Sequence, residues 1–465
     1  MVLPHFSSKV PCEEANSIAT EYCGKVQTMK NLIEKIETRR ALIGVIGLGY
    51  AGLPLVVRFG EERFHVLGFD IDPQKVHLLN EGKSYLGSLP AHRVGDLVRQ
   101  GFFSATSDFS RLSEVDSILI CVPTPLTEKM EPDLIYIENT AGQVAKNMKK
   151  GQLICLESTT YPGTTEEILL PKFRAKGWRE GEDFFLAYSP EREDPGNREY
   201  TTKSIPKVVG GITRNCQRVA KLLYGQIIDE VVAVSSTRVA EMTKLLENIY
   251  RSVNIALVNE LKVLADRMDI DIWEVVEAAS TKPFGYAPFY PGPGLGGHCI
   301  PIDPFYLSWK AREFDFTTRF IQLSGEINVF MPYYVVSKAV DALNEKGKSV
   351  KGSRILILGV AYKRGIDDVR ESPALAIMKL LQEKGANITY NDPHVPRLRP
   401  MRKYMFTMTS KPVTEKLLRQ TDLVMIITDH PEYDFRWIVD HASLIMDTRN
   451  ATRGIRSKRA QIIKA

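Results

Sequence analysis

Short apolar runs alternate with amphipathic stretches between residues 41 and 235. Buried strands are expected in the segments ALIGVIGL, FHVLGFDID, DSILICVPTP, GQLICLESTTYPG, DFFLAYSPER, KVVGGIT and EVVAVSS. The stretch LPLVVRFGEE, which follows the first of these segments, has apolar residues at helical spacing. Strands that alternate with helices predict a parallel sheet with right-handed crossover connections.

The pattern changes at Ser236. From Ser236 to Met268 apolar residues recur at helical spacing, with no glycine or proline inside. At about 1.5 Å per residue, a helix of about 30 residues is about 45 Å long. Such a helix is longer than a crossover needs, so we expect a spine between domains or a dimerisation element. A loop rich in glycine and proline, FGYAPFYPGPGLGGHCIPIDP, and a further helical stretch to about Asn344 follow it.

The strand–turn–helix pattern returns at Ser353. Strands are expected in RILILGVAYK, ANITYNDP, TDLVMIITDH and SLIMDTRN, and a helix in ESPALAIMKLLQEKG. We therefore predict an α/β protein in which two Rossmann-like, doubly wound parallel sheets are joined by a long central helix and a helical region. The expected divisions are an N-terminal extension over 1–40 with a short helix near its end, then domains over 41–235, 236–345 and 346–465.

Composition narrows the class of protein. The chain has 465 residues, of which 44% are hydrophobic and 25% charged, as in an ordinary globular protein. Its net charge of +5 is too weak to indicate nucleic acid and suits an anionic small molecule. The six cysteines form no CxxC, so no metal site or disulfide framework is expected, and a reducing cytoplasm is favoured. We expect no signal peptide, because the N-terminal residues show no basic segment leading into an apolar one. We expect no membrane partner, because the long apolar stretch over 41–57 contains several glycines and a proline.

A glycine-rich turn follows the first predicted strand. The segment from 47 to 52 is Gly47-Leu48-Gly49-Tyr50-Ala51-Gly52, a G-x-G-x-x-G motif. Asp70 stands at the end of the next predicted strand. Such glycines let the backbone approach a pyrophosphate at a helix N-terminus, and the acid accepts hydrogen bonds from ribose hydroxyls. An acid there repels a 2′-phosphate, so the pattern favours NAD over NADP.

Cys299 lies in the segment Gly296-Gly297-His298-Cys299-Ile300-Pro301-Ile302-Asp303-Pro304. Asp303 and Pro304 are expected to be the N-cap and first residue of a helix. A thiol just ahead of a helix N-terminus has a stabilised thiolate, so we favour a nucleophile over a buried structural cysteine. Cys121 and Cys155 lie inside apolar strands, where the structural interpretation is preferred. His298 is expected to orient the loop rather than to act as a ligand or base.

Further polar residues carry weaker signals. Lys244 and Asn248 are four apart and share one helix face, for which a solvated surface is the alternative. Thr159 and Glu191 follow the fourth and fifth predicted strands, at the edge where parallel sheets bind ligands, although loop capping explains them equally well.

Two basic residues flank a turn in the second α/β region. Lys363 and Arg370 put positive charge around a strand-to-helix turn that lacks the full glycine motif. That arrangement suits a nucleotide diphosphate, and ordinary surface charge is the alternative.

Together these segments resemble the nucleotide-sugar 6-dehydrogenase family, the UDP-glucose/GDP-mannose dehydrogenases, from about Ala41 to Asn450. The resemblance implies an N-terminal NAD domain, a central helical dimerisation region and a C-terminal UDP-binding domain. It also implies oxidation of a sugar CH₂OH to a carboxylate in two steps with two NAD, and a homodimer or higher homo-oligomer.

The resemblance also assigns residues to three sites. The catalytic residues it implies are Cys299, Lys244, Asn248, Asp303, Glu191 and Thr159. The cofactor-binding residues it implies are Gly47, Leu48, Gly49, Tyr50, Ala51, Gly52, Asp70, Thr124 and Thr159. The substrate-binding residues it implies are Glu191, Lys244, Asn248, Gly296, Lys363 and Arg449. In the implied mechanism the cysteine traps an aldehyde as a thiohemiacetal, which becomes a thioester and is hydrolysed.

Two segments differ from those usual in the UDP-glucose members and indicate another branch of the family. Arg192-Glu193-Asp194-Pro195-Gly196 follows the Ser-Pro-Glu motif, and His298 precedes the cysteine. Both resemble the N-acetylhexosamine branch of bacterial surface-polysaccharide pathways, with UDP-N-acetyl-D-glucosamine as first candidate substrate. UDP-N-acetylmannosamine and UDP-glucose are alternatives. A one-step hydroxyacid dehydrogenase and a non-enzymatic nucleotide-binding protein are more distant ones.

Overall fold

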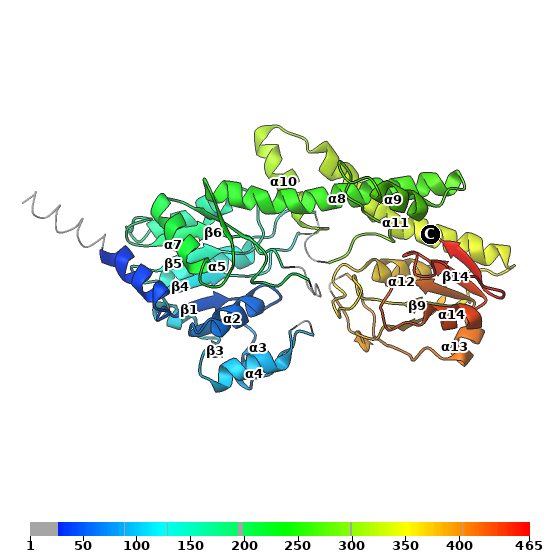
Figure 1. Ribbon diagram of the computed structural model, residues 1–465, viewed down its shortest axis with the longest axis horizontal. Helices are drawn as coiled ribbons and strands as arrows, with labels where there is room; N and C mark the ends of the chain where they lie inside the picture. The colour runs from blue at the N-terminus through cyan, green and yellow to red at the C-terminus, as the bar shows by residue number, and fades with distance from the viewer. Residues whose placement is uncertain (1–26, 88, 128, 194–198, 298–299, 402) are drawn as a thin grey trace, which may run out of the picture. The chain divides into compact units, whose positions relative to one another are not determined.

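The computed structural model describes residues 27–465 apart from 88, 128, 194–198, 298–299 and 402 (Figure 1). The chain divides into two compact units. One comprises Met1–Thr127 with Pro132–Lys244, and the other Glu128–Glu131 with Leu245–Ala465. The finer division at 40, 235 and 345 stays a prediction.

The first unit is built on an eight-stranded sheet with the order β3-β2-β1-β4-β5-β6-β7-β8. Its strands are β1 (Ile43–Ile46), β2 (Val66–Phe69), β3 (Phe103–Thr106), β4 (Ser117–Ile120), β5 (Leu153–Leu156), β6 (Phe185–Tyr188), β7 (Lys207–Gly211) and β8 (Val231–Val234). All seven predicted strands are present. The prediction missed β3, whose sequence FSAT is short and has an exposed serine between two buried residues.

The sheet departs from a purely parallel one at a single pairing. β6 and β7 are antiparallel, whereas every other neighbouring pair in this sheet is parallel. A parallel pair needs a crossover, commonly a helix, on one face of the sheet. Among the described residues between β6 and β7 there is no helix.

Helices complete the first unit. They are α2 (Gly52–Glu61), α3 (Pro73–Asn80), α4 (Ala91–Arg99), α5 (Ile135–Asn147), α6 (Leu170–Arg174), α7 (Arg214–Tyr224) and the short turns η1 (Phe109–Ser113) and η2 (Thr165–Leu169). Both faces of the sheet are buried, because Val45 belongs to one apolar cluster and the next residue, Ile46, to another. The short helix expected before Arg40 spans 27–37, where Leu32 and Ile36 are buried.

The second unit begins within the long helix α8 (Thr237–Arg267), whose 31 residues confirm the predicted helix of about 30 residues. Its role as a spine or a dimerisation element stays a prediction. Further helices follow: α9 (Ile272–Ser280), α10 (Asp303–Ala311), η3 (Arg312–Phe314) and α11 (Arg319–Glu345). None of the helices in the described part of the chain has the length and apolarity that crossing a bilayer requires.

A second sheet has the order β10-β9-β13-β14-β15, and all its pairings are parallel. Its strands are β9 (Arg354–Leu358), β10 (Asn387–Asn391), β13 (Leu423–Ile426), β14 (Leu444–Asp447) and β15 (Gln461–Lys464). The helices α12 (Pro373–Glu383), α13 (Glu415–Gln420) and α14 (Phe435–His441) and an antiparallel hairpin of β11 (Arg397–Leu398) and β12 (Met408–Thr409) accompany it. The predicted fold class, two Rossmann-like sheets with a long central helix, is therefore confirmed.

Candidate functional site

The turn between β1 and α2 uses its three glycines for different purposes. Gly47 has a φ of 90°, and a Cβ on it would lie 2.6 Å from the carbonyl oxygen of Cys121. A Cβ on Gly52 would lie 2.0 Å from the carbonyl oxygen of Gly47. Gly49 differs, because a Cβ there would meet nothing within 4 Å. The first and third glycines are needed by the fold, whereas the second borders open space where a ligand can approach the backbone.

Asp70 lies beside this turn, at the end of β2. Its carboxylate accepts hydrogen bonds from the amides of Leu48 at 3.1 Å and Asp72 at 3.0 Å. It is 7% exposed, and the Lys75 ammonium lies 3.8 Å from it. Each oxygen keeps capacity for another donor, as a ribose diol would supply. The turn and the acid thus fit a dinucleotide.

Thr124 and Thr159 lie in the loops that follow β4 and β5. These strands are parallel neighbours, so both loops leave the same edge of the sheet. The Ser158 hydroxyl donates to the carbonyl of Val122 at 2.7 Å and ties the two loops together. Thr124 is buried and Thr159 is half-buried. The structure places both threonines where parallel sheets bind ligands.

Glu191 and Lys244 meet in the first unit, although 53 residues separate them. The Lys244 ammonium donates to the main-chain carbonyl of Glu191 at 2.5 Å and lies 3.7 Å from its carboxylate. The Glu193 amide donates to the same carboxylate. Lys244 is buried and Glu191 half-buried. The helix-face lysine is therefore not a solvated surface residue, and it pairs with the Ser-Pro-Glu acid.

A buried ion pair that the sequence analysis missed supports this loop. The Lys207 ammonium lies 2.6 Å from the Glu157 carboxylate and donates to the carbonyl of Pro190 at 3.2 Å. The Tyr224 hydroxyl donates to Glu157 as well. Burial raises the pKa of Glu157, and the adjacent ammonium opposes that rise. The available signal was a charged residue at the end of one apolar strand and another at the start of a second.

Cys121 and Cys155 are buried, as predicted. Burial raises the pKa of each thiol, with the charge of Glu157 adding to the effect. Both therefore stay protonated and are unsuited to nucleophilic chemistry.

Glu241, one turn before Lys244, is a second buried acid. It accepts hydrogen bonds from the amides of Gly163 and Thr165 and from the Thr165 hydroxyl. Burial raises the pKa of Glu241 to about 7, although these hydrogen bonds act in the opposite direction. The carboxylate caps η2, which follows the loop that carries Thr159.

In the second unit, Asn248 and Asp303 form another buried pair. The Asn248 side-chain amide donates to the Asp303 carboxylate at 2.5 Å. The prediction that Asp303 is a helix N-cap is wrong by one position, because α10 begins at Asp303 and Ile302 precedes it. Asp303 thereby directs its carboxylate to Asn248. His298 and Cys299 lie outside the described residues.

The loop before Cys299 packs against the second α/β region. The Gly297 amide donates to the carbonyl of Arg370 at 3.0 Å, and a Cβ on Gly296 would lie 2.5 Å from the Cβ of Tyr362. Tyr362 immediately precedes Lys363, which is half-buried. The structure thus brings the glycines of the cysteine loop to the turn that carries Lys363.

Arg449 and Arg370 have different surroundings. The Arg449 guanidinium donates to the carbonyl of Ile427 at 2.9 Å, and its Nη1 lies 2.8 Å from where a Cβ on Gly292 would stand. Arg449 therefore faces the loop that leads to the cysteine. The Arg370 guanidinium donates to the Asp368 carboxylate at 2.7 Å, so much of its charge is compensated locally.

Three family models cover most of the chain. The UDP-glucose/GDP-mannose dehydrogenase family matches with its NAD binding domain over residues 41–228, its central domain over 238–329 and its UDP binding domain over 356–454.

Curated relatives agree with these matches. A UDP-N-acetyl-D-glucosamine 6-dehydrogenase from Pseudomonas aeruginosa is 37% identical, covering 80% of this chain and 87% of the relative. A UDP-N-acetyl-D-mannosamine dehydrogenase from Pyrococcus horikoshii is 34% identical, covering 84% of this chain and 90% of the relative. Among solved structures, a UDP-D-ManNAc dehydrogenase from Pyrococcus horikoshii has a TM-score of 0.82 and 31% identity, covering 91% of this chain and 98% of that one.

Proposed function

This chain belongs to the UDP-glucose/GDP-mannose dehydrogenase family and is an NAD-dependent UDP-sugar dehydrogenase, and we propose that it oxidises C6 of UDP-N-acetyl-D-glucosamine to the uronic acid. The name of the Pseudomonas aeruginosa relative supports this sugar, as does the Arg-Glu-Asp-Pro-Gly sequence after Glu191. Other relatives are named for N-acetylmannosamine and N-acetylgalactosaminuronic acid, so the N-acetylmannosamine and N-acetylgalactosamine epimers are the competing substrates.

Gly47, Gly49, Gly52 and Asp70 would hold the cofactor. When bound, NAD⁺ accepts a hydride, and the two oxidations of one sugar use two NAD⁺ molecules. In the first oxidation the C6 hydroxyl loses its proton and C6 loses a hydride, which leaves an aldehyde. We assign the proton transfer to Asp303 with water.

The second oxidation needs a tetrahedral carbon from which hydride can leave. The Cys299 thiolate would bond to the aldehyde carbon, and hydride loss from C6 would then give a thioester. Water would attack that thioester and expel the thiolate, and the product would be the carboxylate. Lys244 and Asn248 would stabilise the oxyanion at each addition, and Glu191 would orient the water. Thr159 would lie near the nicotinamide.

The observation that carries this proposal is the burial and pairing of two polar residues on α8. Lys244 and Asn248 are both buried, and each faces an acid assigned to the chemistry, Glu191 and Asp303 respectively. Charged and polar side chains are seldom buried unless they are paired, so the two pairs indicate that these positions serve the chemistry. The packing of Gly296 and Gly297 against Tyr362 supports a nucleotide-sugar site that includes Lys363 and Arg449.

The decisive experiment counts NADH per product over a panel of nucleotide sugars. The panel is UDP-glucose, UDP-N-acetylglucosamine, UDP-N-acetylmannosamine, UDP-N-acetylgalactosamine and GDP-mannose. Two NADH per uronic acid, with the highest kcat/KM for UDP-N-acetylglucosamine, is the expected result. A higher kcat/KM for an epimer would reject the substrate. One NADH per turnover would reject the two-step mechanism, and none with any sugar would favour a non-enzymatic nucleotide-binding protein.

We also propose that two copies pair through α8. Large apolar side chains on this helix are 39–60% exposed at helical spacing, namely Leu246, Tyr250, Leu257, Leu261 and Leu264. Phe320, Leu323 and Phe330 on α11 are exposed as well. An apolar stripe of this length is costly to leave in water and is typical of an interface between subunits.

A further inference from the structure

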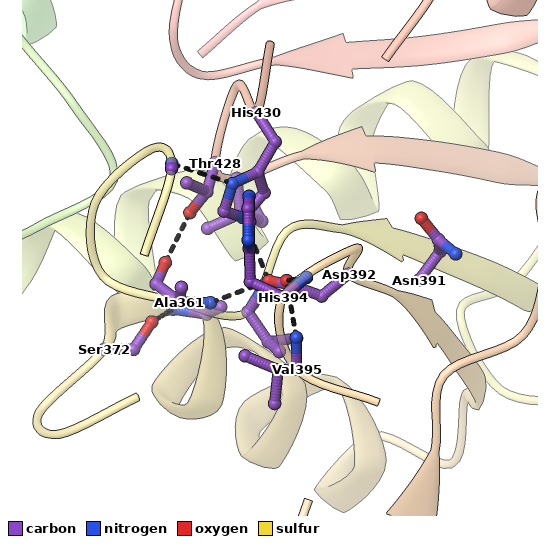
Figure 2. Close-up of polar contacts among 12 residues, drawn as sticks. Ala361, Ser372, Asn391, Asp392, His394, Val395, Thr428 and His430 are labelled. Carbon is purple, nitrogen blue, oxygen red and sulfur yellow. Dashed lines mark hydrogen bonds and ion pairs between the residues drawn. The ribbon is translucent and has the colours of Figure 1, made fainter. Parts of the chain in front are cut away.

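A buried aspartate–histidine pair lies beside the sheet of the second unit, outside the residues assigned to the chemistry (Figure 2). Asp392 follows β10, and His430 follows β13. Nε2 of His430 lies 3.0 Å from Oδ2 of Asp392, and neither side chain is exposed to solvent. Nothing in the oxidation of a sugar carbon requires this pair.

Both residues hold the loop that follows β9. The Asp392 carboxylate accepts hydrogen bonds from the amides of Val360 at 2.7 Å and Ala361 at 3.0 Å. Nδ1 of His430 accepts one from the amide of Gly365 at 3.1 Å. The loop is therefore fixed at its start and again at 365. Lys363 lies between these two points.

Other contacts support the same arrangement. The Asp392 carboxylate also accepts hydrogen bonds from the amides of His394 and Val395. The Thr428 hydroxyl donates to the carbonyl of Ala361 (Figure 2), with 2.6 Å between the two oxygens. Burial alone would raise the pKa of Asp392, but the hydrogen bonds it accepts from His430 and the backbone amides keep that pKa below its ordinary value.

The hydrogen bonds define the tautomer of the histidine. Because Nδ1 of His430 accepts from the Gly365 amide, the ring proton is on Nε2 and points at Asp392. This also argues against a metal site, although ligand atoms of His394, His430 and Glu432 lie within 4.8 Å of one another. Neither ring nitrogen of His430 has a lone pair left for a cation.

We propose that Asp392 and His430 are positioning residues for nucleotide-sugar binding, which act by fixing the loop over 359–365 so that Lys363 faces the nucleotide. This inference rests on the proposed role of Lys363 in the substrate site. It assigns to the pair an effect on affinity for the UDP part of the substrate and none on the affinity for NAD.

Three substitutions separate the two hydrogen bonds of the histidine. His430→Asn keeps an acceptor near the Nδ1 position and loses the donor to Asp392. His430→Gln keeps a donor near the Nε2 position and loses the acceptor for Gly365. His430→Phe loses both. His441→Gln on α14 is the matched control, because that ring is partly exposed and its contacts, with Trp437 and Glu415, lie away from the loop over 359–365.

The full-length variants are compared by UDP binding in titration calorimetry, by KM for the sugar nucleotide and for NAD, and by hydrogen exchange over 359–368. We expect the Kd for UDP and the KM for the sugar nucleotide to rise at least about fivefold in His430→Gln, since the Gly365 amide loses its acceptor and the loop loses one of its two anchoring points. The rise should be larger in His430→Phe and absent in His441→Gln. Exchange over 359–368 should accelerate, and KM for NAD should not change.

Unchanged UDP affinity and unchanged exchange in both His430→Asn and His430→Gln would overturn the inference, whether or not His430→Phe folds. Stabilisation of the unmodified protein by Zn²⁺ alone, lost in these variants, would overturn it in favour of a metal site. If the unmodified protein did not bind UDP at all, the proposed substrate site would fail instead. Faster exchange over 359–368 in the variants would then still support the positioning of the loop.

Discussion

Replacing Lys207 by methionine should destabilise the first unit in a way that depends on pH. Methionine keeps most of the length and apolar character of the lysine stem and removes only the ammonium. The Glu157 carboxylate then loses its partner at 2.6 Å while staying about 1% exposed, and the Pro190 carbonyl loses a donor at 3.2 Å. Removing one member of a buried ion pair typically costs about 3–5 kcal/mol.

The gap between pH 7 and the ordinary pKa of a glutamate gives a second estimate of this loss of stability. An orphaned Glu157 can escape its charge by taking up a proton, which at pH 7 costs about 3 kcal/mol from an ordinary value of 4.5. The lost hydrogen bond to Pro190 adds about 1 kcal/mol. The sum of about 4 kcal/mol agrees with the range above. Because protonation becomes easier in acid, the penalty should shrink by about 1.4 kcal/mol for each pH unit below 7.

The assay is urea unfolding between pH 5 and 8, together with hydrogen exchange of the β5 and β7 amides, which reports on this unit alone. Glu157→Gln/Lys207→Met should recover most of the lost stability, since the buried charge is gone. Lys150→Met, which breaks an exposed pair with Asp183, is the control and should cost less than about 1 kcal/mol. A penalty for Lys207→Met that stays constant with pH, or a double variant as unstable as the single one, would refute the reasoning.

Four further outcomes are expected. Cys299→Ser should lower turnover to the uronic acid by orders of magnitude while NAD and UDP-sugar still bind; near-normal turnover would refute the nucleophile assignment, and lost cofactor binding would make the residue structural. NAD should be preferred over NADP in kcat/KM, and Asp70→Ala should narrow the preference. The pKa of Glu241 is about 7 in the folded protein against 4.5 ordinarily, so between these pH values the folded state binds more protons than the unfolded state. The free energy of unfolding should therefore fall by about 3 kcal/mol as pH rises from 4.5 to 7. Urea unfolding of Glu241→Gln should no longer show this loss. Light scattering should find a dimer, which Leu257→Glu on the exposed face of α8 should convert to a monomer, and a monomer at all concentrations of the unmodified protein would refute the interface.

Features encoded in neighbouring residues could be predicted from the sequence. Most strands of both sheets could be predicted because short apolar runs in an alternating α/β chain indicate buried strands, whereas β3 and β15, which are only partly buried, were missed. The long helix was visible because its apolar spacing continues without glycine or proline. The glycine turn and Asp70 were visible because the conformations that a dinucleotide site needs impose residue types at fixed spacing.

Only the tertiary structure decided which buried polar side chains pair with one another. Lys244 was found on a helix face, but only the fold places its ammonium on Glu191, which comes from a loop 53 residues earlier. The antiparallel pairing of β6 and β7 is not encoded in the pattern of apolar runs, which identifies strands but not their direction. Glu157 with Lys207, and Asp392 with His430, escaped notice because each partner is an ordinary polar residue at the end of an apolar strand. Their burial and pairing arise only when distant strands become neighbours, and there desolvation makes each partner necessary to the other.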